Sequence, residues 1–198
     1  HEKKFKISSL KKEARMRDYD DAFMWLSDSR IVNICYNSDE PNIGLKLNMT
    51  RTTLKCYMAD TGLLISHAFD EKGLVSEEVY KKLLFGKLEL NEGMIFENIV
   101  SQMLVATGRK LYFYSKSDNK DASSRMEIDF LIRKATISNR HNISPIEVKS
   151  GKNYTASSLD KFRKKYNQQL SVSYIIHAGD LKEEGDRMFI PLYMTPLL

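Results

Sequence analysis

Two segments in which apolar and charged residues alternate dominate the second half of the chain. The first covers residues 127–132 and the second covers residues 146–149. Alternation with a period of two predicts half-buried strands, because successive side chains of a strand point to opposite faces. The polar stretch 133–144 between them is long enough for a hairpin connection. We therefore predict a hairpin whose apolar side faces the core.

Other stretches of the chain have periodicities of their own. Apolar spacing predicts helices over 18–29, 60–69, 76–85, 93–108 and about 157–168. Alternation predicts strands over 31–36, 54–58, 111–114, 172–177 and 188–193. Asp60 suits the N-cap of the second helix and Gly108 the end of the fourth. The elements together predict a mixed α/β (α+β) protein.

A boundary near residue 70 divides the predicted elements into two parts. Helix, strand, turn and strand over residues 18–58 correspond to the second half of a winged helix. No recognition helix precedes them, so we expect residues 1–69 to be a partial winged-helix segment and connector that packs between domains. Residues 70–198 are expected to form the main domain.

Composition indicates an ordinary globular protein. The 198 residues are enough for a substantial core, with 42% hydrophobic and 29% charged residues. No apolar run approaches the roughly 18 residues that span a bilayer, and the first residues lack the apolar segment of a signal peptide. Cys35 and Cys56 fall in predicted strands and suit burial as small hydrophobic residues. We expect a cytoplasmic protein without a membrane partner.

The charge of the chain permits nucleic-acid binding. The net charge is +5 and the pI is about 9.0, which favours contact with phosphates. Basic residues crowd positions 3–17, where a solvated helix face is the preferred explanation. A second basic group follows the charged strand and is the predicted, weaker nucleic-acid contact: Lys152, Lys161, Arg163, Lys164 and Lys165.

Three charged residues share one side of the predicted hairpin. Asp129, Glu147 and Lys149 cluster there if both strands turn their apolar sides to one core. Two carboxylates that repel each other are the oxygen ligands that Mg²⁺ prefers, and a neighbouring lysine could position a water molecule. The alternative is an exposed hairpin with a surface ion pair worth at most about 1 kcal/mol.

Glu97 interrupts the apolar surface of the helix predicted over 93–108. A carboxylate on so apolar a helix needs a partner, because burying an unpaired charge is costly. One hypothesis places Glu97 beside the strand carboxylates as a metal ligand. The other is a structural salt bridge to Lys149 or to an arginine.

These residues resemble a known family. Asp129, a spacer and Glu147-Val148-Lys149 resemble the motif of the PD-(D/E)XK nuclease superfamily. The wider order of motifs is similar to the C-terminal region of bacterial and archaeal AAA-type ATPases, which is catalogued as a domain of unknown function. The matching stretches are MADTGLL at 58–64, GMIFENIV at 93–100, EIDFL at 127–131 and IEVKSG at 146–151.

The resemblance implies a restriction-endonuclease-like core of αβββαβ order after a partial winged helix. It implies Mg²⁺ or Mn²⁺ held by Asp129, Glu147 and Glu97, with Lys149 and Glu97 in catalytic roles and a DNA phosphodiester as substrate. Ile128 stands where a proline often precedes the aspartate in this superfamily.

The resemblance also leaves a non-catalytic alternative open. The chain has no phosphate-binding G-x-x-x-x-G-K-[ST] loop, so ATP is expected to act only through an ATPase domain outside this sequence. That ATPase domain is one expected partner and DNA is the other. The alternative function is a DNA- or partner-binding module coupled to the ATPase, with its acidic residues kept for structure.

Overall fold

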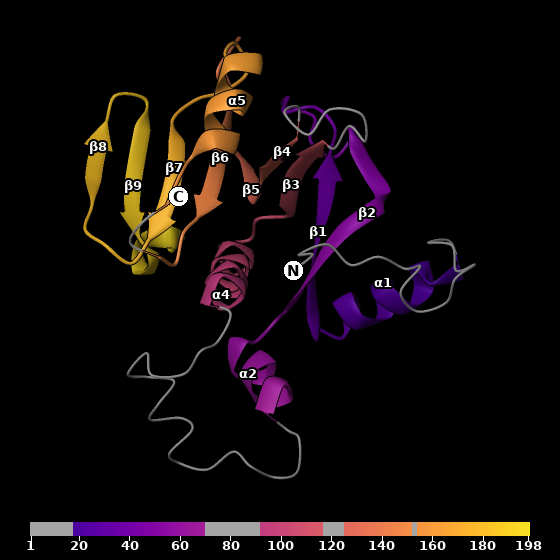
Figure 1. The fold of residues 1–198 in the computed structure, drawn as a ribbon. Helices are drawn as coiled ribbons and strands as arrows, with labels where there is room; N and C mark the ends of the chain where they lie inside the picture. Colours follow the sequence, from indigo (N-terminus) through magenta and orange to yellow (C-terminus); the bar gives the residue numbers. More distant parts are fainter. Residues whose placement is uncertain (1–17, 70–91, 117–124, 152–153) are drawn as a thin grey trace.

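The computed structural model describes residues 18–69, 92–116, 125–151 and 154–198. The chain folds into a mixed α+β structure with two sheets (Figure 1), as the sequence predicts. Among the described helices, none is long and apolar enough to cross a membrane. The elements are α1 (Asp20–Asp28), β1 (Val32–Ser38), β2 (Met49–Met58), α2 (Thr61–Phe69), α4 (Glu92–Ala106), β3 (Leu111–Lys116), β4 (Met126–Ile128), β5 (Phe130–Arg133), β6 (Ile143–Val148), α5 (Ser157–Lys165), β7 (Ser173–His177), β8 (Lys182–Glu184), β9 (Arg187–Pro191) and the 3-10 helix η4 (Leu192–Leu197).

Each sheet combines parallel and antiparallel strands. The first has the order β2-β1-β3-β4, and the second has the order β5-β6-β7-β9-β8. In the first sheet β1 lies parallel to β3, so the two parts separated by the predicted boundary share one sheet. The boundary near residue 70 remains a prediction, and the helix predicted over 76–85 lies outside the described residues.

The strand predicted over 127–132 is interrupted at Asp129. Before it, Ile128 ends β4 and pairs with β3 in the first sheet; after it, Phe130 begins β5 in the second. Ile128 therefore lies in a different buried cluster from Phe130 and Ile132. The prediction that these three share a face is wrong, because the chain passes from one sheet to the other at Asp129.

β6 is buried on both faces rather than half-buried. Every residue from Ile143 to Val148 is buried, and β6 pairs with β5 on one side, where Phe130 stands opposite Ile146, and with β7 on the other. Ile146 packs with residues of α4, whereas Ile143 packs with residues of α5. The predicted hairpin pairing is confirmed, but both of its faces are covered.

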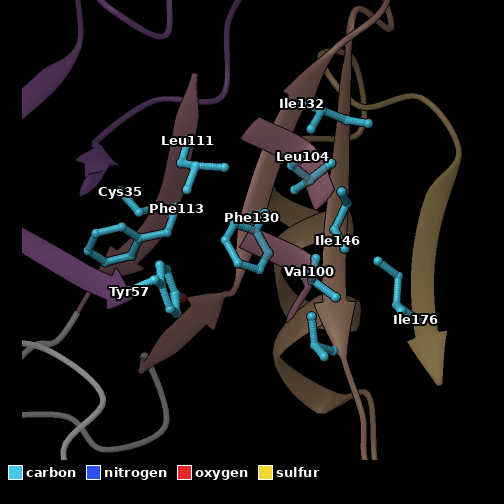
Figure 2. Close-up of a cluster of buried hydrophobic side chains, with 11 residues drawn as sticks. Cys35, Tyr57, Val100, Leu104, Leu111, Phe113, Phe130, Ile132, Ile146 and Ile176 are labelled. Atoms are coloured by element: carbon cyan, nitrogen blue, oxygen red, sulfur yellow. The ribbon is translucent and has the colours of Figure 1, made fainter. Parts of the chain in front are cut away.

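One apolar cluster joins the two sheets to α4 (Figure 2). Rings from both sheets meet in it, with the centroids of Tyr57 and Phe130 5.5 Å apart. Burial of apolar surface at such a joint is the main force that holds layers together. The buried members are Cys35, Tyr57, Val100, Leu104, Leu111, Phe113, Phe130, Ile132, Ile146, Val148 and Ile176.

Helix ends agree with the predictions more closely than helix faces do. Asp60 caps α2 by accepting a hydrogen bond from the backbone N–H of Leu63 at 2.9 Å, and Gly108 follows α4 with φ +80°. The apolar residues of α1 are only partly buried. Phe23 is buried, but Trp25 is 64% exposed.

Asn98 connects α4 to the end of β2. Its amide accepts a hydrogen bond from the backbone N–H of Met58 at 2.8 Å and donates to the Met58 carbonyl at 3.0 Å. It also donates to the Thr61 hydroxyl at 3.0 Å. Asn98 is 2% exposed, and its hydrogen bonds hold α4 against the end of β2.

We predict that Asn98→Leu lowers the free energy of unfolding by roughly 1–3 kcal/mol, because both backbone groups of Met58 lose their partner. Urea denaturation measures the change. Asn142→Leu, which removes hydrogen bonds of an exposed turn around Ser138, is the control and should cost less. Equal losses in the two variants would contradict the role of Asn98.

Candidate functional site

A buried lysine on β2 lies at the centre of the acidic residues. The Lys55 side chain is 1% exposed. Its Nζ lies 3.1 Å from Glu127 Oε1 and 3.4 Å from Asp129 Oδ1. It also lies 3.6 Å from Glu97 Oε2 and 5.2 Å from the centroid of the Phe113 ring. We call Lys55, Glu97, Glu127 and Asp129 the Lys55 cluster.

The cluster keeps Lys55 charged. Burial alone would lower the pKa of Lys55, but the carboxylates of Asp129, Glu97 and Glu127 outweigh it and hold the pKa above its ordinary value of 10.5. An ammonium surrounded in this way repays its desolvation through ion pairs and charge-assisted hydrogen bonds.

Two buried partners of Glu97 lie among the described residues. Besides Lys55, its Oε2 accepts a hydrogen bond from the Tyr57 hydroxyl at 3.2 Å. Burial and the nearby Glu97 charge raise the pKa of Tyr57, which keeps that hydroxyl a donor. The structural salt bridge considered from the sequence is therefore present, but its cation is Lys55 rather than Lys149 or an arginine.

Asp129 connects the first sheet to β6. Its Oδ2 accepts a hydrogen bond from the backbone N–H of Val148 at 2.9 Å, while Oδ1 faces Lys55. The side chain thus fixes the chain where β4 ends and β5 begins. Through this bond Asp129 reaches the backbone between Glu147 and Lys149.

Glu147 pairs with Lys149 and with the start of α5. Its Oε2 lies 3.0 Å from Lys149 Nζ, and its carboxylate accepts a hydrogen bond from the backbone N–H of Leu159. Ala156, the N-cap residue of α5, supplies no side-chain cap, so Glu147 takes that place. Burial raises the pKa of Glu147, against the opposing effects of Lys149 and the Leu159 N–H.

The predicted acidic residues therefore divide into two ionic groups. Glu97 and Asp129 share Lys55, and Glu147 shares Lys149. The sequence analysis missed Lys55, which it treated as one residue of a strand. The available signal was that Lys55 and Tyr57 lie two positions apart, on one face of β2, and Tyr57 is a core residue.

The donor set does not suit a Mg²⁺ or Mn²⁺ site. Within the described ranges, no group of three or more His, Cys, Asp or Glu residues could hold a metal ion. The ammonium of Lys55 lies among the oxygens of Glu97 and Asp129 that the resemblance implies as ligands, and Lys149 covers one oxygen of Glu147.

Two of the predicted nucleic-acid contacts make bonds within the fold. Arg163 forms an ion pair with Asp186 and donates a 2.8 Å hydrogen bond to the Ser171 carbonyl. The Nζ atom of Lys165 lies 4.8 Å from the centroid of the Tyr166 ring, in a cation–π contact. The exposed side chains of Lys161 and Lys164 belong to α5, whereas Lys152 lies outside the described residues.

Comparison with known proteins finds two family matches. A family model described as a domain of unknown function (DUF4143) matches residues 92–195. A second, described as a domain of unknown function (DUF8612), matches residues 1–72. No curated protein and no solved structure matches the chain. Glu97, Glu127 and Asp129 lie within the first match, whereas Lys55 lies within the second.

We predict that Lys55→Met lowers the free energy of unfolding at about pH 7 by roughly 3–5 kcal/mol, because it leaves buried carboxylates without their cation. Urea denaturation measures the loss. Lys182→Met, which removes an exposed pair with Glu184, is the control and should not shift the midpoint. Adding Glu97→Gln to Lys55→Met should recover part of the loss. A Lys55→Met protein as stable as the wild type would contradict the assigned role.

The pH dependence of this loss follows from the raised pKa of Lys55. A cation whose folded pKa lies above 10.5 contributes its full stabilisation below that pH and loses it only as the pH rises further. The difference in unfolding free energy between wild type and Lys55→Met should therefore stay constant from about pH 7 to about pH 10. Denaturation series at several pH values measure it, and a difference that shrinks by about pH 9 would show that Lys55 deprotonates early.

Proposed function

This chain belongs to the DUF4143 family, and we propose that it serves an AAA-type ATPase as a non-catalytic binding module built on a nuclease-like fold. The observation that carries the proposal is the ammonium of Lys55, 3.1–3.6 Å from three carboxylates. It lies where the resemblance implies a divalent metal ion.

Charge repulsion argues against metal catalysis at this position. Two unit charges about 4 Å apart interact with about 4 kcal/mol at an effective dielectric constant near 20, so a divalent ion would face about twice that from one ammonium. Since Lys55 is buried and held by Asp129, Glu97 and Glu127, it cannot move into solvent without breaking the cluster. The carboxylates therefore serve the fold.

The order of elements supports the nuclease-like part of the proposal. α4, β3, the β4–β5 pair of segments, β6, α5 and β7 follow one another as helix, strands, helix and strand. Motif order over 58–151 supports the association with an ATPase, whose nucleotide-binding domain would lie in a part of the polypeptide outside this sequence. A cytoplasmic location is part of the same proposal.

Hydrolysis of a DNA phosphodiester with Mg²⁺ or Mn²⁺ is the second candidate function. One observation favours it. The hydrogen bond from the Val148 N–H to Asp129 brings that carboxylate beside the backbone that carries Glu147 and Lys149, as the family motif requires. The two candidate functions make different predictions for the wild-type chain and a divalent ion. The binding module does not need the ion, whereas the nuclease binds it and cleaves DNA.

We predict that the wild-type chain binds neither Mg²⁺ nor Mn²⁺ detectably in calorimetry and does not cleave plasmid DNA in their presence, because Lys55 already pairs with the carboxylates. Gel electrophoresis of plasmid follows cleavage. Metal-dependent cleavage that disappears in Asp129→Ala and Lys149→Ala, but persists in the exposed control Lys182→Ala, would overturn the non-catalytic proposal.

A further inference from the structure

A pocket of about 430 Å³ lies apart from the Lys55 cluster. Its described lining residues come from α1, from β1 and β2 with the turn between them, and from the end of α4 through the start of β3. None of the Lys55 cluster residues lines it. Its volume falls in the range of about 300–1,000 Å³ that is common for small-ligand sites.

The charged residues in the described lining of the pocket are all basic. Lys46 and Arg51 come from the β1–β2 side, and Arg109 and Lys110 come from the turn after α4. No aspartate or glutamate is among the described lining residues. Since cations frame the pocket from two separate segments, an anion that enters it meets positive charge on both sides.

The basic side chains keep their charge available. Within the described parts of the chain, Lys46, Arg51 and Lys110 take part in no ion pair and no side-chain hydrogen bond. Arg109 donates to the backbone carbonyls of Arg133, at 3.2 Å, and of Leu198. Neither Arg133 nor Leu198 lines the pocket, so the cations that face an anion there are those of Lys46, Arg51 and Lys110.

The remaining walls are mainly apolar. Ile34, Tyr36, Met49 and Tyr112 line the pocket together with the polar side chain of Asn33. An occupant that suits these walls has an apolar, flat body as well as negative charge. A nucleotide unit has both, with its base against apolar and aromatic side chains and its phosphates on lysine and arginine.

We propose that this pocket receives one nucleotide of a single-stranded nucleic acid. A base that is paired and stacked in a duplex cannot enter a concave site, whereas an unpaired base can. The phosphates before and after that base would meet the basic residues of the two framing segments. This inference rests on the proposed binding function and deepens it, because it names the class of partner and its site.

The test is fluorescence anisotropy with a fluorescein-labelled oligothymidylate of about twelve nucleotides. This length lies within the range of about 4–16 nucleotides that single-strand-binding OB-folds cover. Arg51→Glu and Lys110→Glu should each weaken binding by about tenfold or more, because each replaces a phosphate-contacting cation by a repelling carboxylate. Arg140→Glu, a charge reversal in an exposed turn that does not line the pocket, is the matched control and should bind as the wild type does. Circular dichroism and urea midpoints verify that all three fold.

Competition with unlabelled ligands identifies the occupant. Oligothymidylate should compete at lower concentration than thymidine monophosphate, a duplex of the same length, or polyglutamate. Equal competition by any of these three, no binding by the wild type, or an unaffected Arg51→Glu would overturn the inference.

Binding and cleavage of the same oligonucleotide distinguish a failure of the pocket inference from a failure of the proposed function. Cleavage of the oligonucleotide with Mg²⁺ would overturn the non-catalytic function, while weakened binding by Arg51→Glu and Lys110→Glu would still support the pocket. Absence of binding without cleavage would overturn the pocket alone.

Discussion

The ion pairs around Lys55 are the interaction on which the rest of the structure depends. Burying a single ammonium or carboxylate costs several kcal/mol, and only close mutual pairing repays it. Lys55 belongs to β2, Glu97 to α4 and Glu127 to β4, and Asp129 lies where β4 passes into β5. Since the charges come from four places in the chain, those elements must meet in one arrangement before the buried charges are paired.

This requirement links two parts of the sequence that different family models describe. The cation comes from β2, in the first part, and the carboxylates come from the second. Two further connections bring them together: the parallel pairing of β1 with β3 and the amide of Asn98 on the backbone of Met58. The acidic residues of the second part owe their buried cation to the first, so neither part forms the Lys55 cluster alone.

The sequence predicts what depends on neighbouring residues and misses what depends on distant ones. Period-two alternation identified β6 and its pairing with β5, and the local chemistry of Asp60 and Gly108 identified helix ends. The same alternation continues through Asp129, so it could not reveal that the chain changes sheets there. A lysine within a strand usually reaches solvent, and only the fold brings three distant carboxylates around Lys55. β8, which is exposed at every residue, carries no apolar pattern to detect.

The three acidic residues singled out in the sequence each make a contact that stabilises the fold. Asp129 holds the backbone of Val148, Glu97 joins Tyr57 to Lys55, and Glu147 caps α5 where Ala156 cannot. Tyr36 and Tyr112, which line the basic pocket, pack with a different buried cluster from Tyr57 and Phe113. Under the proposed function, the acidic residues build the scaffold and the binding chemistry belongs to the basic ones.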